Sequence, residues 1–136
     1  MGKEPRATPR VVSVAIPIFR AGGKILLVTS RKRSDKWVLP KGGWEPIDVT
    51  LEAAACREAL EEAGVRGTIS RFVVTIPLPN TIYHVYEMEV TTVEDDWLER
   101  KERTREWMDF SEAARRLAWK PELLQGLMLS TLAPKR

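Results

Sequence analysis

Residues 57–65 read, in order, Arg57-Glu58-Ala59-Leu60-Glu61-Glu62-Ala63-Gly64-Val65. On an α-helix, residues three and four positions apart share a face, so Glu58, Glu61 and Glu62 would point the same way. Three like charges on one face destabilise an isolated helix, and a cation beside them would relieve the repulsion. Because carboxylate oxygens suit hard cations, the spacing predicts a site for Mg²⁺ or Mn²⁺ with these three residues as ligands. The alternative is an ordinary solvated acidic face.

The sequence on both sides of this stretch favours a site. Upstream, Pro40 is expected to end a strand, and Gly42 and Gly43 would let the backbone approach a ligand closely. Downstream, Gly64 is typical of a left-handed helix C-cap, and Thr50 offers an N-cap side chain. We therefore expect a glycine loop that leads into a carboxylate-bearing helix over residues 50–63.

Taken together, the two glycines, the spacer and the Arg-Glu-x-x-Glu-Glu-x-Gly run resemble the Nudix box of the Nudix hydrolases. Two positions differ from the usual pattern. Val49 stands where an acidic residue is common, and the nearest acid is Asp48, so the spacer carries one extra residue and a shorter carboxylate. Ala59 replaces a larger aliphatic residue. The resemblance implies an α+β fold of the α/β/α sandwich type, with a mixed β-sheet flanked by helices.

The whole chain has the length and composition of one globular domain. Its 136 residues are 43% hydrophobic and 30% charged, and we expect a single domain over residues 1–136 with a flexible start at residues 1–9. No apolar run approaches the ~20 residues needed to cross a bilayer, so no membrane partner is expected. No signal peptide is recognisable.

Cys56 is the only cysteine, so no intramolecular disulfide can form, and a reducing compartment, cytoplasmic or nuclear, is expected. A thiol nucleophile would need a base beside it, and the single histidine, His84, lies on a predicted strand. We interpret both side chains as packing residues.

The charge distribution is uneven although the net charge is only +3. Residues 1–41 hold ten Lys or Arg and two acids, a balance of +8, whereas residues 42–64 hold six acids and one Arg, a balance of −5. A basic surface beside an acidic metal site suits a small, highly phosphorylated substrate.

Hydrophobic patterning predicts the remaining elements. Runs rich in β-branched residues or with alternating polarity predict strands at residues 11–19, 25–29, 36–39, 68–75, 82–90 and 105–109. The charged segment 94–103 is expected to be a loop. Asp109 is a candidate N-cap for a helix over 113–119, and Pro121 for the first turn of a last helix.

The loop Pro-Lys-Gly-Gly-Trp-Glu is similar to that of the diphosphoinositol polyphosphate phosphohydrolase branch, whose members also cleave diadenosine polyphosphates. That resemblance covers about residues 9–125. It implies metal-dependent hydrolysis of a phosphoanhydride, with Glu61 as a metal ligand or general base and Arg57 as a catalytic residue that orients a carboxylate. The substrate-binding residues that it implies are Arg10, Arg31, Lys32, Arg33, Lys41, Gly42, Gly43, Arg105 and Lys120.

Other functions remain open at this point. A nucleotide substrate would need an aromatic platform, which Trp37 or Trp44 could provide, although packing explains both equally well. The basic run at residues 31–36 has a plain alternative as a solubilising hairpin end. The competing functions are decapping of messenger RNA, hydrolysis of another nucleoside-diphosphate-linked compound, and binding of an inositol polyphosphate or RNA without cleavage. No stable nucleic-acid partner is expected.

Overall fold

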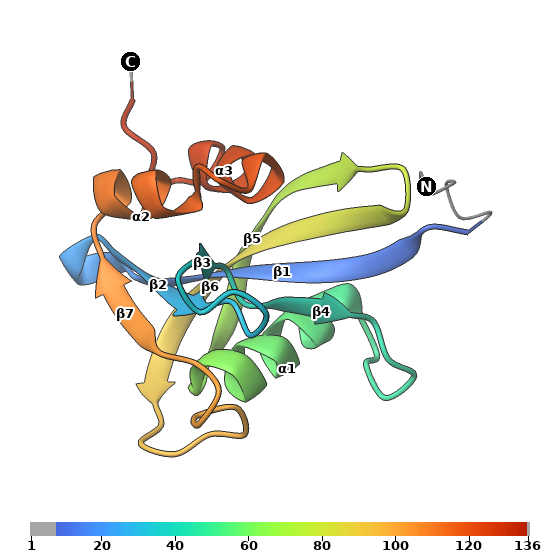
Figure 1. Cartoon of the computed structure of the whole chain (residues 1–136), viewed down its shortest axis with the longest axis horizontal. Helices are drawn as coiled ribbons and strands as arrows, with labels where there is room; N and C mark the ends of the chain where they lie inside the picture. The colour runs from blue at the N-terminus through green and yellow to red at the C-terminus, as the bar shows by residue number, and fades with distance from the viewer. Residues whose placement is uncertain (1–7, 136) are drawn as a thin grey trace.

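The structure is a computed structural model that describes residues 8–135, so most of the segment expected to be flexible, residues 1–7, lies outside the described residues. Within residues 8–135, seven strands form one mixed sheet (Figure 1). The elements in chain order are β1 (Arg10–Phe19), the short 3₁₀ turn η1 (Arg20–Gly22), β2 (Lys24–Thr29), β3 (Trp37–Val38), β4 (Lys41–Gly43), α1 (Leu51–Ala63), β5 (Val65–Pro77), β6 (Thr81–Val93), β7 (Arg105–Met108), α2 (Phe110–Leu117) and α3 (Pro121–Met128).

The central strands run in the order β3-β2-β1-β6-β5, with β4 paired to β1 and β7 paired to β2. The β1 and β6 strands are parallel, and all the other pairs are antiparallel. Helix α1 covers one face of the sheet, and α2 and α3 cover the other (Figure 1). The expected mixed sheet between helices is confirmed.

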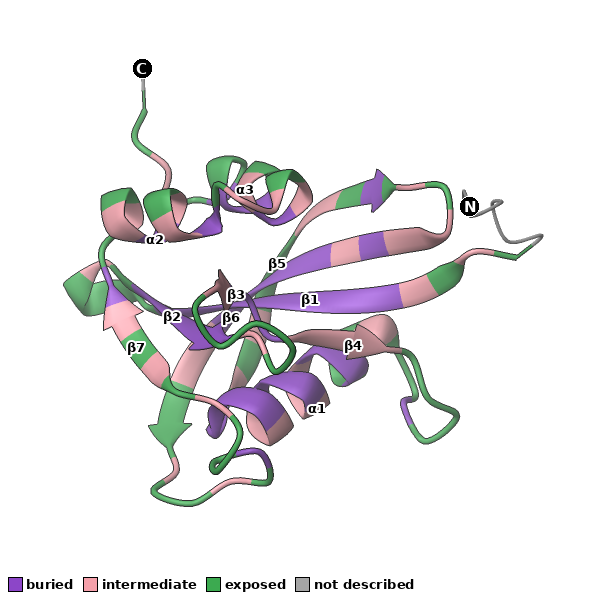
Figure 2. Ribbon diagram, viewed as in Figure 1, coloured by how far each residue is buried: buried purple, intermediate pink, exposed green. Residues whose placement is uncertain are grey.

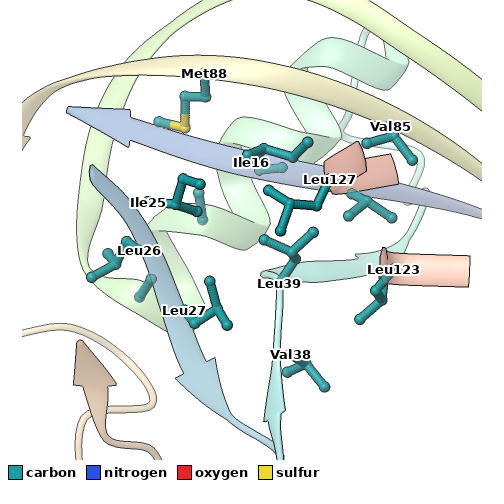
Figure 3. Close-up of a cluster of buried hydrophobic side chains, with 14 of the residues drawn as sticks. Ile16, Ile25, Leu26, Leu27, Val38, Leu39, Val85, Met88, Leu123 and Leu127 are labelled. Carbon is teal, nitrogen blue, oxygen red and sulfur yellow. The ribbon is translucent and has the colours of Figure 1, made fainter. Parts of the chain in front are cut away.

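The core lies on both faces of β1 and β2. Residues 12–18 of β1 are all buried, as are Ile25, Leu26, Leu27 and Val28 of β2, and side chains from β3, β6 and α3 close over them (Figure 3). A strand buried on both faces reads as a continuous apolar run, which is why this part of the sheet could be recognised from sequence.

Helix α1 begins and ends where its sequence predicts. Thr50 Oγ1 accepts a hydrogen bond from Ala53 N at 3.0 Å, and Gly64 is left-handed at φ 67°. Helix α1 buries one side (Figure 2), and the buried residues include four alanines, of which Ala55, Ala59 and Ala63 belong to the core. Because these side chains are small, the helix packs close to the strands.

The predicted glycine loop is in fact a strand in its first part. Gly43, Gly42 and Lys41 of β4 pair with Val12, Ser13 and Val14 of β1. Ser13 also donates to the first carbonyl of α1, from Oγ to Leu51 O at 2.8 Å. Strand β4 and the start of α1 are therefore both joined directly to β1.

Candidate active site

Two carboxylates lie in the seam between α1 and β4. The side chains of Glu58 and Glu62 are 9% and 8% exposed, and Glu62 Oε1 accepts a hydrogen bond from Lys41 N at 3.2 Å. A Cβ atom on Gly42 would lie 2.0 Å from Glu58 Oε2, so only glycine leaves room for this carboxylate. Gly42 of the glycine pair therefore makes room for Glu58, the first glutamate of the acidic run.

A cation beside Glu58 and Glu62 would stabilise their ionised forms. Burial, with the Glu58 carboxyl group beside it, raises the pKa of Glu62 to about 8, and burial also raises the pKa of Glu58. Two adjacent buried carboxyl groups cannot both ionise cheaply unless a cation neutralises them. Oxygen is their only ligand atom, which suits a hard divalent ion.

Arg57 ties the loop after β4 to the same helix. Its Nε and Nη2 atoms donate to the two oxygens of Asp48, each at 2.9 Å, and Nη2 also donates to Gly43 O at 3.1 Å. The Nη1 atom lies 3.1 Å from Glu58 Oε2 and 3.3 Å from Glu61 Oε1. Hydrogen bonding to Asp48 raises the pKa of Arg57, which therefore stays charged. Asp48, a residue inferred only from the shifted spacing, is the buried anchor of this arrangement.

Glu61 lies at the mouth of the seam, with its side chain 32% exposed. Arg57 Nη1 donates to Glu61 Oε1 and also lies beside Glu58, whereas Glu62 accepts from Lys41 N. Among residues 8–135, no three acidic, histidine or cysteine side chains are gathered as a ready metal site. The three predicted ligands line one cavity of about 440 Å³, which we call the carboxylate cleft. Its lining residues are Arg10, Arg31, Lys41, Gly42, Gly43, Trp44, Glu45, Glu58, Glu61, Glu62 and Glu99.

A second cavity, of about 670 Å³, adjoins the carboxylate cleft and shares Arg31 and Lys41 with it. We call it the basic pocket. It is lined by Ser30, Arg31, Lys32, Arg33, Val38, Lys41, Arg103, Trp119 and Lys120. Burial lowers the pKa of Lys41, and the nearby charges of Lys120 and Arg103 lower it further. An anion in this pocket would relieve that repulsion.

Both the sequence and the fold are similar to those of known proteins. A profile of the NUDIX domain matches residues 9–127. The chain belongs to the Nudix family. It is 35% identical over 120 residues to the Arabidopsis thaliana protein "Nudix hydrolase 12, mitochondrial", an alignment that covers 77% of this chain and 58% of that relative. It is 36% identical over 115 residues to the Bos taurus protein "Diphosphoinositol polyphosphate phosphohydrolase 3-beta", covering 78% and 70% of the two chains.

Among solved structures, a NUDIX hydrolase from Nitrosomonas europaea superposes with a TM-score of 0.75 at 21% identity, covering 88% of this chain and 86% of that one. At this identity the likeness shows the Nudix fold. The chain spans less than two thirds of the length of the plant relatives that it matches, so their activities do not transfer directly.

Nudix hydrolases generally use divalent metals such as Mg²⁺. The residues present fit such an ion, because Glu58 and Glu62 are buried, offer only oxygen ligands, and have pKa values that burial raises. Two cations of the protein lie beside them, Arg57 with Nη1 at 3.1 Å from Glu58 Oε2 and Arg103 with Nη2 at 3.5 Å from Glu62 Oε1. Glu61 would add a third carboxylate ligand from the mouth of the carboxylate cleft.

The structure brings most of the predicted substrate-binding residues together. Arg10, Lys41, Gly42 and Gly43 line the carboxylate cleft, and Lys32, Arg33 and Lys120 line the basic pocket with the shared Arg31. Arg105 is not among them. Its guanidinium lies under the end of α1, where it donates to the carbonyls of Ala63, Gly64 and Glu94.

Sequence reasoning missed Arg103, Trp119 and Glu99. Arg103 is 9% exposed and joins the two cavities, donating to Glu99 Oε1 at 2.7 Å and to Thr29 O at 2.8 Å. It sits in a run of mixed charges, in which no local signal separates it from its neighbours. Trp119 follows a helix and could have been noted only because it precedes Lys120.

The two residues interpreted as packing groups lie away from the charged cavities. Cys56 is half-buried on α1, and burial raises the pKa of its thiol, which disfavours the nucleophilic thiolate. His84 pairs with Thr75 across β5 and β6, with 3.0 Å between Nδ1 and Oγ1. In the described residues, no helix is both long and apolar enough to span a membrane.

Proposed function

We propose that this Nudix protein, acting as a single domain over residues 1–136, hydrolyses phosphoanhydride bonds of diphosphoinositol polyphosphates in the presence of Mg²⁺ or Mn²⁺. The observation that carries the proposal is the basic pocket, in which six cations surround one cavity that opens beside the carboxylate cleft: Arg31, Lys32, Arg33, Lys41, Arg103 and Lys120. The similarity to a diphosphoinositol polyphosphate phosphohydrolase supports the same substrate class.

The basic pocket matches a compact polyanion better than a nucleobase. A ring that carries phosphates on most of its carbons presents several dianions at once, and each can accept charge-assisted hydrogen bonds. The pocket does contain one aromatic ring, that of Trp119. However, Arg33, Lys36 and Lys120 lie over this ring at 5.8, 6.0 and 5.5 Å, and its N–H donates to Trp37 O at 2.9 Å. Trp119 therefore gathers cations at the pocket rather than offering a free face to a base.

The residues of the cleft divide the chemistry between them. When bound, a divalent ion would neutralise phosphate oxygens and lower the pKa of a water that it coordinates. Glu58 and Glu62 would hold this ion. Glu61, at the mouth, would accept a proton from the attacking water, and Arg57 would orient Glu61 through its hydrogen bonds to Glu61 and Asp48. Phosphates bound by the basic pocket would leave the scissile anhydride at the boundary with the cleft.

Diadenosine polyphosphates are the second substrate class, because their linear chain of phosphates can also lie along Arg31 and Lys41, the two residues shared by both cavities. Because the chain has one cysteine and no possible internal disulfide, we also propose a reducing compartment, cytoplasmic or nuclear.

The test is a substrate panel. Diphosphoinositol polyphosphates, diadenosine polyphosphates and capped RNA are compared by kcat/KM with Mg²⁺ and with excess EDTA. The proposal expects the highest value for the inositol substrates and no turnover in EDTA. Binding of inositol polyphosphate in calorimetry without turnover on any substrate would establish a binder instead, and preference for capped RNA would establish a decapping enzyme.

A further inference from the structure

The last turn of α1 is held from outside by residues 94–105, which comprise the connection from β6 to β7 and the first residue of β7 and which we call the clamp segment. Four consecutive carbonyls at this end of the helix each accept a hydrogen bond from it. They are Glu61 O from Glu99 N at 3.0 Å, Glu62 O from Trp97 Nε1 at 3.1 Å, Ala63 O from Arg105 Nη1 at 3.0 Å, and Gly64 O from Glu94 N at 2.8 Å.

Arg105 and Trp97 are the side chains at the centre of this contact. The guanidinium of Arg105 lies 3.9 Å from the centre of the Trp97 ring, and its Nη2 atom donates to Glu94 O at 2.7 Å. A Cβ atom on Gly64 would lie 2.7 Å from Arg105 Nη1 and 2.8 Å from Trp97 Cδ2. The glycine that ends the helix therefore also makes room for the clamp segment.

This turn carries the residues that the chemistry needs. The final carbonyls of a helix have no partner within the helix and carry partial negative charge, so this end tends to fray. Here the problem is greater, because Glu58, Glu61 and Glu62 add three carboxylates to the same end. A cation that donates to these carbonyls from the clamp segment opposes both the fraying and the excess negative charge, and it does so without entering the carboxylate cleft.

We propose that Arg105 and Trp97 are positioning residues, which fix the last turn of α1 so that Glu61 and Glu62 are presented together to a divalent cation. This inference rests on the proposed function, in which that cation binds at the cleft. It replaces the expectation that Arg105 contacts substrate. Groups that orient metal ligands typically contribute about 10- to 100-fold to metal affinity.

The experiment uses two conservative variants. Arg105→Lys keeps the charge but loses the fork that reaches three carbonyls, and Trp97→Phe keeps an aromatic ring but loses the donor to Glu62 O. Arg100→Ala is the matched control, because Arg100 lies in the same segment and makes an exposed ion pair with Asp96, 3.7 Å between Nη1 and Oδ1. Two quantities are measured: Mn²⁺ affinity by titration, and hydrogen exchange of the Glu94 and Glu99 amides.

We expect about tenfold weaker Mn²⁺ binding and faster exchange of both amides in Arg105→Lys, a smaller change of the same kind in Trp97→Phe, and parental values in Arg100→Ala. With an active substrate, kcat should fall while KM stays near the parental value. Folded variants with parental Mn²⁺ affinity and parental exchange rates would overturn this inference alone. A parent protein that binds no Mn²⁺ would overturn the proposed function as well.

Discussion

Asp48 and Arg57 form a two-bond ion pair, in which Arg57 Nε and Nη2 each donate to the Asp48 carboxylate at 2.9 Å. Asp48 also accepts from Glu45 N at 2.9 Å, so the pair closes the loop between β4 and α1 and joins it to the helix. The Arg57 hydrogen bonds hold the pKa of Asp48 below its ordinary value. Loop closure and orientation of Arg57 therefore depend on one buried carboxylate.

Asp48→Asn should weaken both the closure of the loop and the orientation of Arg57. The amide keeps the size of the side chain but loses the charge and one acceptor, so the free energy of unfolding should fall by about 3 kcal/mol. Arg57 would then be free to pair more closely with Glu61, and kcat should fall roughly tenfold. Denaturant unfolding and steady-state kinetics measure the two effects. Asp35→Asn, the same change at an exposed hairpin position, is the control and should alter neither. Parental stability and kcat in Asp48→Asn would contradict this account.

The course of the helix and the placing of its carboxylates were predictable because their signals are local. Thr50 and Gly64 cap the helix through groups three to five residues away, and the i, i+3 and i, i+4 spacing of the acids fixes their common face. The β1 strand was equally predictable, because burial on both faces leaves a continuous apolar run.

The roles of Arg103 and Arg105 depend instead on contacts across the fold. Both lie in a stretch of charged residues, yet Arg103 turns into the basic pocket and Arg105 lies beneath the end of α1. The pairing of β7 with β2 sets the position of Arg105, and the hydrogen bonds that Arg103 and Thr104 make with Thr29 set the position of Arg103. The β4 strand was missed for a related reason, because two glycines carry no side-chain pattern and pair only through their backbones.

Glu61→Gln should abolish most activity while sparing the fold. Its carboxylate is one-third exposed at the cleft mouth, so its loss should change stability little, whereas losing the proton acceptor should lower kcat by about 10²- to 10⁴-fold. Kinetics with Mg²⁺ and thermal unfolding are compared for parent and variant. Undiminished turnover by the folded variant, or full parental activity in excess EDTA, would rule out the proposed mechanism.

A buried ion cluster away from the cleft should set the acid limit of stability. Burial alone would raise the pKa of Glu87, but hydrogen bonds from Thr131, Arg20 and Arg71 outweigh it and hold the pKa below its ordinary value of 4.5. A lowered folded-state pKa means that the stabilisation is complete above pH 4.5 and is lost as pH falls through the folded value.

Glu87→Gln should therefore lower the free energy of unfolding by about 2 kcal/mol at pH 7 and flatten its dependence on pH below 4.5. Denaturant unfolding at a series of pH values provides the comparison. Parallel stability curves for parent and variant throughout the acid range would show that Glu87 has no such role.

Cys56→Ala should leave kcat within a few-fold of the parent. Burial raises the pKa of the thiol, and the residue contributes packing on α1 rather than chemistry. The measurement is kcat for both proteins before and after treatment with a thiol reagent. Inactivation of the parent by a small reagent that spares the Ala variant, with the helix intact, would indicate a chemical role.

The basic pocket is tested by removing its exposed rim. Arg31, Lys32 and Arg33 are exposed, and Arg31 makes only long ion pairs, 3.8 Å to Glu99 and 3.7 Å to Glu102, so replacing all three with Ala should leave the fold intact. Each lost charge-assisted hydrogen bond to a phosphate should cost roughly 1–3 kcal/mol in kcat/KM, partly screened by salt. A polyphosphorylated ring should lose more than a linear diadenosine polyphosphate, because it engages these side chains with more groups.

The measurement is kcat/KM for both substrate classes at two ionic strengths. The control is a second triple variant with the same change in net charge, Lys24→Ala, Lys101→Ala and Arg115→Ala, whose exposed side chains lie outside the lining of both cavities. It should show only the small, salt-sensitive loss expected from long-range attraction. Equal losses in the two triple variants would reduce the basic pocket to general electrostatics, and a loss confined to dinucleotides would establish the nucleotide as the preferred substrate.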